Sequence, residues 1–210
     1  IRYDPDQPRD ESGRFGEGSG GGGGAGRPTD TALTDAANSP LQESKTLGGG
    51  RQGKTTWEQR EGGTIVRKEF PPGSESRAQV HSEVLSSRVA DTLGVSAPAV
   101  AALDNRTVVM EHISGQTWAQ RGGDLPQSLI DSDEGRLLGL HDVLTRNIDR
   151  SPGNFMIDEA GSLVAIDHGY GFQASPTAGL HSPFAAPFSN GTGMGFADSI
   201  DISSRDMGIV

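Results

Sequence analysis

The sequence predicts an α+β fold in which pairs of short strands alternate with helices. Three segments, at residues 54–70, 98–113 and 154–167, each show two runs of strand-forming residues around a tight turn. Helices are expected between these hairpins, at residues 76–93 and at about 126–144. Strands joined by a tight turn pair in antiparallel fashion, so the pattern favours antiparallel strand pairs packed beside helices.

The first 43 residues are expected to form a disordered linker. Their centre reads GEGSGGGGGAG, a composition with large backbone entropy and little surface to bury. The nearby stretch RDESGRFG weakly resembles the tails of phage head and portal proteins, which would make this region a tether. The chain has no initial methionine and no signal-peptide pattern, so we expect a fragment of a longer protein.

Residues 44–115 are expected to form an N-terminal lobe rich in strands. Its first hairpin joins KTTWEQR (residues 54–60) to TIVRKEF (64–70) through the turn EGG, and two prolines end the second strand. Its second hairpin joins PAVAAL (98–103) to TVVMEHI (107–113) through the turn DNR.

The helix expected at residues 76–93 lies between these two hairpins. Ser76 and Gln79 have the spacing of a capping box, in which each side chain bonds the backbone N–H of the other residue. Gly94 follows the last apolar residue and is expected to end the helix in the left-handed conformation. Apolar residues form one stripe along it: Val80, Val84, Leu85, Val89 and Leu93.

Residues 116–175 are expected to form the core of a C-terminal lobe. It would hold the helical region and the hairpin of NFMI (154–157) and LVAID (163–167) around DEAGS. Residues 176–210 are rich in glycine, proline and serine and are expected to be irregular.

Composition excludes several classes of function. The formal net charge of −10 argues against a protein that grips the nucleic-acid backbone. No apolar run approaches the roughly 18 residues of a membrane span. The absence of cysteine excludes disulfides and thiolate metal sites. It is also compatible with a cytoplasmic location, and we expect a cytoplasmic protein that is bacterial or phage-encoded.

The octet GGGRQGKT at residues 48–55 fits the Walker A pattern of P-loop nucleotide hydrolases. A Walker loop follows a buried strand and begins a helix at its lysine, whereas this octet follows a polar segment and precedes an extended one. A flexible glycine linker is one alternative. We favour a glycine loop between two strands, in which Gly48, Gly49, Gly50 and Gly53 let backbone N–H groups approach phosphate oxygens.

Lys68 is the first candidate for contact with those phosphates. Strand alternation places it on the same face as Val66 and Phe70, where a charge is costly unless an anion meets it. Glu83 lies at the border of the apolar stripe of the following helix and could pair with this lysine. The alternatives are a surface lysine on an edge strand and a solvated glutamate.

Three oxygen-bearing side chains follow the helical region in fixed order. Asp149 precedes Asn154 by five positions, and Asp167 follows thirteen positions later at the end of the partner strand. The hairpin brings Asn154 and Asp167 to the same end, where their oxygens could share a magnesium ion, and Asp149 could act on a phosphate acceptor. Alternatively, such residues only cap turns.

These stretches resemble the phosphatidylinositol 3- and 4-kinase family, especially type II phosphatidylinositol 4-kinases and related bacterial proteins, and more distantly HipA-type kinases. The likeness covers residues 46–172. The stretches that carry it are LGGGRQGKT, VRKEF, HSEVLSSRVADTLGVSAPAV, NIDRSPGNFMI and VAIDHGYGF.

The resemblance implies a protein-kinase-like fold of two lobes and a role for each candidate. Lys68 would bind the phosphates of ATP and Glu83 would hold that lysine in place. Asp149 would be the catalytic carboxylate, and Asn154 and Asp167 would bind Mg²⁺. Asn147 and Arg150, which flank Asp149, would shape its loop. Residues 109–113, with Glu111 and Ile113, would form the hinge that contacts adenine through the backbone.

The same resemblance implies an ATP- and Mg²⁺-dependent phosphotransferase with an unknown acceptor. A protein or small-molecule acceptor is favoured over a lipid, because no basic cluster would attract an anionic membrane. Only residues 168–210 follow Asp167, so the C-terminal lobe is expected to be minimal or truncated. Two alternatives stay open: a non-catalytic interaction module tethered to a phage-type structural protein, and a kinase fold that transfers AMP.

Overall fold

The computed structural model describes residues 27–50, 53–73, 75–172 and 181–188. The five-stranded antiparallel sheet comprises β1 (Leu41–Gly50), β2 (Gly53–Arg60), β3 (Gly63–Glu69), β4 (Val100–Ala102) and β5 (Thr107–Glu111), in the order β1-β2-β3-β5-β4. The three-stranded sheet comprises β6 (Gly115–Thr117), β7 (Phe155–Asp158) and β8 (Leu163–Ala165). The helices are α1 (Asp30–Asn38), α2 (Ser76–Leu93), α3 (Trp118–Arg121), α4 (Gln127–Ile130), α5 (Asp133–Thr145) and the 3₁₀ helix η1 (Pro183–Phe188).

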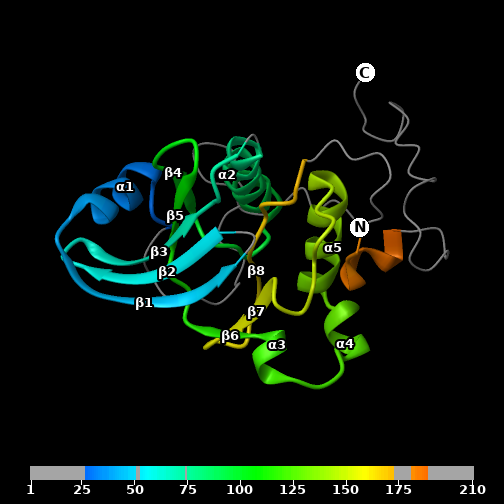
Figure 1. Cartoon of the computed structure of the whole chain (residues 1–210). Helices are drawn as coiled ribbons and strands as arrows, with labels where there is room; N and C mark the ends of the chain where they lie inside the picture. The colour runs from blue at the N-terminus through cyan, green and yellow to red at the C-terminus, as the bar shows by residue number, and fades with distance from the viewer. Residues whose placement is uncertain (1–26, 51–52, 74, 173–180, 189–210) are drawn as a thin grey trace, which may run out of the picture.

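Two lobes follow from this order, as Figure 1 shows: the five-stranded sheet with α1 on one side, and α3, α4, α5 and η1 on the other. Each of the three predicted hairpins is present, as β2–β3, β4–β5 and β7–β8. The expected boundary between residues 115 and 116 falls inside β6, which pairs with β7 of the second lobe.

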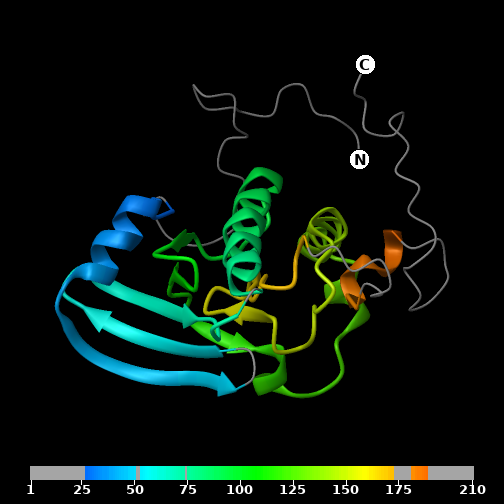
Figure 2. The same cartoon turned by 45° about the horizontal axis from the view of Figure 1, so that its top comes forward.

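Strand alternation divides the five-stranded sheet into two buried faces. In β5, Val109 packs in a cluster with Ile65 and with Leu33 of α1. Its neighbours Val108 and Met110 belong instead to the cluster that α2 covers. Adjacent strand residues point to opposite faces, so α1 and α2 lie on opposite sides of the sheet, and Figure 2 shows α2 between this sheet and α5.

The prediction of a linker up to residue 43 is wrong for its last part. Residues 30–38 form α1, which begins at a Thr29 cap, and β1 starts at Leu41. Helix α1 buries Leu33 and two alanines against the sheet. The glycine-rich stretch and RDESGRFG lie outside the described residues, so the tether and the phage connection stay predictions.

A buried carboxylate helps to hold α1 on the sheet. Glu58 of β2 pairs with Arg60 at 2.6 Å and with Arg67 at 2.9 Å. The two guanidinium groups also donate to backbone oxygens at the end of α1, Arg60 to Ser39 at 2.6 Å and Arg67 to Ala37 at 3.2 Å. Carbonyls at a helix C-terminus lack intrahelical donors, so the arginines satisfy them with favourable charge.

Replacing Glu58 with glutamine is expected to lower the free energy of unfolding by about 1–3 kcal/mol at pH 7. Burial raises the pKa of the Glu58 carboxyl, but hydrogen bonds and charge from Arg67 and Arg60 outweigh it, so its pKa is lowered on folding. The stabilisation is therefore complete above the unfolded pKa of about 4.3 and disappears as the pH falls through the folded value.

Urea unfolding of the wild type and of Glu58→Gln at pH 7, 5, 4 and 3 tests this expectation. The difference in unfolding free energy between the two proteins should be the same at pH 7 and pH 5 and should shrink as the pH falls below about 4.3. Glu69→Gln, which changes an exposed carboxylate on β3, is the matched control and should behave like the wild type. A stability difference that is independent of pH would contradict an ionic role for Glu58.

The ends of α2 agree only in part with the sequence. Gly94 adopts the left-handed conformation with φ of 74°, as predicted. The predicted capping box is wrong: Glu75 occupies the cap position without a side-chain hydrogen bond, and the Ser76 hydroxyl donates to the Gly73 carbonyl instead. Ser76 is already the first residue of the helix and Glu75 before it has helical backbone angles, so Ser76 does not occupy the extended cap position that a capping box requires.

The core of the second lobe includes a segment that was expected to be irregular. Phe184 and Ala185 of η1 are fully buried, and Phe184 packs in one cluster with Leu138 of α5 and Phe155 of β7. A Cβ at Gly139 would lie 2.0 Å from the Phe184 carbonyl oxygen, so only glycine allows α5 and η1 to approach this closely. Residues 183–188 are thus part of the lobe, which corrects their assignment to an irregular C-terminal segment.

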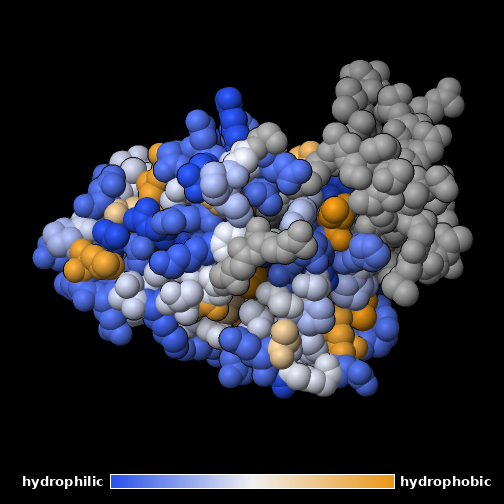
Figure 3. Space-filling view, viewed as in Figure 1, coloured by the Kyte–Doolittle hydropathy of each residue, from blue (hydrophilic) through white to orange (hydrophobic). Residues whose placement is uncertain are grey.

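One face of the molecule shows how its hydrophobic residues are distributed. On the face seen in Figure 3, hydrophilic residues predominate and hydrophobic ones form small, separate areas. Among the described residues, no helix has the length and apolar character needed to cross a membrane.

Candidate active site

The described residues of the glycine octet, 48–50 and 53–55, lie at the end of the paired strands β1 and β2. Gly48 and Gly49 pair with Thr55 and Lys54, and Gly50 pairs with Gly53. Lys54 and Thr55 thus continue as strand β2, where a Walker loop would begin a helix. The structure agrees with the glycine loop between two strands and contradicts both the P-loop and the flexible linker.

Gly53 is required by the neighbouring strand. Its φ is +112°, and a Cβ there would lie 2.1 Å from the Glu69 carbonyl oxygen of β3. By contrast, a Cβ at Gly48 would meet no atom within 4 Å. The loop is therefore anchored at its β2 end by backbone packing and open at Gly48.

Lys68 of β3 joins both lobes. Its Nζ lies 2.8 Å from Glu83 Oε1 of α2 and 2.6 Å from Asp167 Oδ1, which follows β8. Burial lowers the pKa of Lys68, but the charges of Glu83 and Asp167 outweigh it, so the pKa is raised and the ammonium stays charged. Sequence reasoning thus located three residues that the fold brings into direct contact.

Glu83 is held from two sides. Its Oε1 accepts a hydrogen bond from the Lys68 ammonium, and its Oε2 accepts one from the His168 backbone N–H at 2.9 Å. Burial raises the pKa of this carboxyl, the charge of Lys68 lowers it, and Asp167 raises it again, with a net increase. Since its side chain is only 1% exposed, Glu83 serves Lys68 and the backbone next to Asp167, away from solvent.

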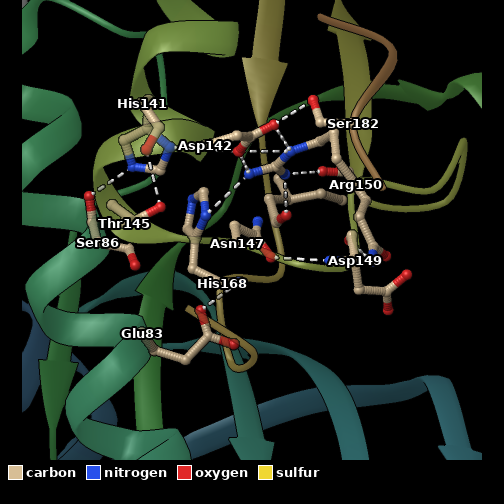
Figure 4. A network of polar contacts seen from close by, with 12 residues as sticks. Glu83, Ser86, His141, Asp142, Thr145, Asn147, Asp149, Arg150, His168 and Ser182 are labelled. Carbon is tan, nitrogen blue, oxygen red and sulfur yellow. Dashed lines mark hydrogen bonds and ion pairs between the residues drawn. The ribbon is translucent and has the colours of Figure 1, made fainter. Parts of the chain in front are cut away.

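Asp149 and Asn154 are linked through the loop between α5 and β7. The Asn154 amide nitrogen donates to the Asp149 carbonyl at 2.7 Å, and the Asn147 amide oxygen accepts the Asp149 N–H at 3.3 Å. In Figure 4 the Asp149 carboxylate points away from the other labelled side chains. Hydrogen bonds thus fix the backbone of Asp149 and leave its carboxylate out of these contacts.

Asn154 and Asp167 lie at neighbouring strand ends. Ile166, directly before Asp167, donates its N–H to the Asn154 carbonyl at 3.1 Å. Asp167 adopts a left-handed φ of 54°, a conformation that aspartate tolerates better than most residues and that is enriched at functional sites. The backbone therefore places Asn154 close to Asp167, at the same end of the β7–β8 hairpin.

The donor set suits magnesium. The amide nitrogen of Asn154 is already used on Asp149, which leaves the amide oxygen for a ligand, and Asp167 offers a carboxylate that is 33% exposed. Mg²⁺ is a hard cation that takes oxygen ligands, usually one or two carboxylates together with substrate phosphates. The residues present thus fit the ion that was predicted from the sequence.

A buried polar network behind the loop was not found from the sequence. It connects His141 and Asp142 of α5, Arg150 of the loop, His168 and Ser182 (Figure 4). Burial raises the pKa of Asp142, but the charge of Arg150 and several hydrogen bonds outweigh it, so the pKa is lowered and the carboxylate is ionised. Burial and nearby cations lower the pKa of His168 strongly, so its ring is neutral.

The expected hinge connects the two sheets. Glu111 ends β5 and donates its N–H to Ala99 at 2.9 Å, and the chain then passes Ile113 to reach β6. The His112 ring makes an edge contact with Trp57 of β2 at a centroid distance of 6.3 Å. The carboxylate of Glu111 accepts the Ala99 N–H, so this side chain is used within the sheet.

Comparison with known proteins supports the resemblance noted in the sequence. Residues 137–203 match the profile of the family described as phosphatidylinositol 3- and 4-kinase, a span that includes Asp149, Asn154 and Asp167. A search of curated protein sequences found no match to the chain.

Solved structures support the fold. The chain is similar to the Rio2 kinase of Chaetomium thermophilum, solved as an ADP/Mg²⁺-phosphoaspartate complex, with a TM-score of 0.50 and 15% identity. The likeness covers 66% of this chain and 50% of that kinase, so the chain spans half of its length. The predicted α+β, protein-kinase-like fold is therefore confirmed.

Proposed function

We propose that this protein is an ATP- and Mg²⁺-dependent phosphotransferase. The contact of Lys68 with both Glu83 and Asp167 carries the proposal most directly, because it joins a strand, a helix and the second lobe at one cation. A lysine buried to 7% exposure next to an open glycine loop suits the phosphate groups of a nucleotide. ADP and Mg²⁺ in the complex of the structurally similar Rio2 kinase support the same ligands.

Each predicted residue takes one role in this proposal. The loop of Gly48, Gly49, Gly50 and Gly53 covers the phosphates, and Lys68 binds them while Glu83 holds it. The backbone at Glu111 and Ile113 receives the adenine.

Asp149 orients the acceptor hydroxyl and takes its proton. The acceptor oxygen forms a bond to the γ-phosphorus, the bond from that phosphorus to the β,γ-bridging oxygen breaks, and ADP leaves. Asn154 and Asp167 hold Mg²⁺, which neutralises charge on the phosphates when bound. The remaining work of the protein is to position the reacting groups.

Calorimetric titration with ATP, with and without Mg²⁺, tests the nucleotide site. The wild type should bind ATP more tightly with Mg²⁺, and Asp167→Asn should lose that gain while remaining folded, since Lys68 keeps Glu83. Asp124→Asn, which changes an exposed aspartate, is the control and should match the wild type. If the folded wild type does not bind ATP in the presence of Mg²⁺, the proposal is wrong and an interaction module is favoured.

Product analysis distinguishes phosphoryl transfer from AMP transfer. With candidate protein and small-molecule acceptors, phosphoryl transfer releases ADP and moves label from the γ-phosphate of ATP. Release of pyrophosphate with label transferred from the α-phosphate would replace the proposal by the AMP-transferase alternative.

A further inference from the structure

Arg150 uses each of its five N–H donors. Its Nε and one Nη2 hydrogen bind Asp142, with Nε at 3.2 and 3.1 Å from the two carboxylate oxygens and Nη2 at 2.8 Å from Oδ1. The second Nη2 hydrogen is directed at His168 Nδ1, 3.2 Å away. Nη1 binds two carbonyl oxygens, that of Asn154 and that of Ile166 at 2.7 Å. A guanidinium offers five donors in a rigid plane, so its position fixes these four partners relative to one another.

Three of the four partners surround the expected metal ligands. Asn154 is one of the ligands, Ile166 directly precedes Asp167, and His168 directly follows it. The His168 ring presents its Nδ1 to the guanidinium at 3.2 Å, so Arg150 also fixes the ring that follows Asp167. One buried side chain therefore holds the backbone before Asp167, the imidazole ring after it and the backbone of Asn154.

Arg150 is itself fixed from the far side. The Asp142 carboxylate accepts a hydrogen bond from the Ser182 hydroxyl at 2.7 Å in addition to those from Arg150. The backbone N–H of Arg150 donates to the His181 carbonyl at 3.1 Å. Both Asp142 and Arg150 are almost completely buried, at 0% and 1% exposure. A buried ion pair contributes little to net stability compared with apolar packing, so full use of its donors is better explained by positioning.

We propose that Arg150 is the positioning residue that sets the distance between Asn154 and Asp167 and thereby the affinity for the divalent cation. This inference rests on the proposed function, since it concerns the same metal ligands. Residues that orient metal ligands typically change metal affinity or activity by about 10- to 100-fold when replaced. Arg150 touches neither substrate nor reacting atoms in this scheme.

Arg150→Lys tests the proposal, because lysine keeps the charge and loses the planar fork. Affinity for Mn²⁺ is measured by electron paramagnetic resonance with the non-hydrolysable analogue adenylyl imidodiphosphate, and affinity for the analogue alone by calorimetry. We expect Mn²⁺ affinity to fall by about 10- to 100-fold and metal-free nucleotide affinity to change by less than about twofold. Arg136→Lys, an exposed arginine on α5, is the control and should match the wild type.

The outcomes separate this inference from the proposed function. If the wild type binds Mn²⁺ and the analogue and folded Arg150→Lys binds both equally well, Arg150 has only a structural role and the inference alone is wrong. If the wild type binds neither, the proposed function fails and the inference falls with it.

A measurement on the wild type decides the matter if Arg150→Lys does not fold. The guanidinium is bonded directly to the Asn154 carbonyl and to the carbonyl of Ile166 before Asp167, so a cation held by Asn154 and Asp167 should change the electrostatic surroundings of the guanidinium. In ¹⁵N-arginine-labelled protein, the Arg150 side-chain resonances should shift when Mg²⁺ is added to the analogue complex. Unchanged resonances on saturation with Mg²⁺ would overturn the proposal.

Discussion

Replacing Asp149 with asparagine is expected to slow phosphoryl transfer by about 10²- to 10⁴-fold, the usual contribution of a positioned proton acceptor. The backbone of Asp149 is held by Asn147 and Asn154, and these bonds do not involve its carboxylate. Asparagine has nearly the same shape and can keep them, but it cannot take a proton at neutral pH. The loss should therefore appear in kcat, with KM for ATP almost unchanged.

Steady-state kinetics of the wild type, Asp149→Asn and Asp124→Asn with one identified acceptor check this expectation. The exposed Asp124 carries the same charge change away from the site, so its variant should keep the wild-type kcat. A loss below about tenfold in Asp149→Asn, or a rise in KM for ATP with unchanged kcat, would assign the proton transfer to another group.

Local patterns predicted the residues that meet at Lys68 because each signal lies within one element. Lys68 alternates with Val66 and Phe70, and the structure places its Nζ 5.1 Å from the centre of the Phe70 ring. Glu83 lies at the edge of an apolar stripe, a position from which a helix presents a side chain to its neighbour. Such periodicities survive in any fold that buries the stripe.

The first helix was missed because its stability comes from distant partners. Helix α1 has one leucine and several alanines and polar residues, so its composition resembles the linker before it. It is held by contacts with the sheet and by Arg60 and Arg67 at its C-terminus, which lie more than twenty residues away. Tertiary contacts of this kind leave no periodic signal in the segment itself.

The network around Arg150 was missed for a related reason. Asp142 and Arg150 are charged residues that composition places at the surface, and their pairing depends on how the loop after α5 turns back. Ser182 lies forty residues from Asp142, in a segment with the composition of a loop. The family resemblance implies that Arg150, next to Asp149, shapes this loop, but the sequence does not show the buried partners through which it does so.

Replacing Phe184 with alanine is expected to lower the free energy of unfolding by about 3–5 kcal/mol, as for other fully buried aromatic side chains. Phe184 is 0% exposed and meets Phe155 edge to face, with ring centres 5.1 Å apart. No other large apolar side chain of the described residues after Gly171 is buried to the same extent. A loss of this size is a large part of the roughly 5–15 kcal/mol that stabilises a typical domain.

Urea unfolding of Phe184→Ala and Phe188→Ala measures this contribution with a matched control in the same helix. Phe188 is 38% exposed, so its variant should lose less than about 1 kcal/mol. Equal losses in the two variants would show that η1 does not pack as described. A selective loss in Phe184→Ala would show that η1 stabilises the second lobe, in which the His181 carbonyl also accepts the Arg150 backbone N–H. The position of the catalytic loop would then depend on a segment that follows it by about thirty residues, and nucleotide binding should decrease in parallel with the folded fraction.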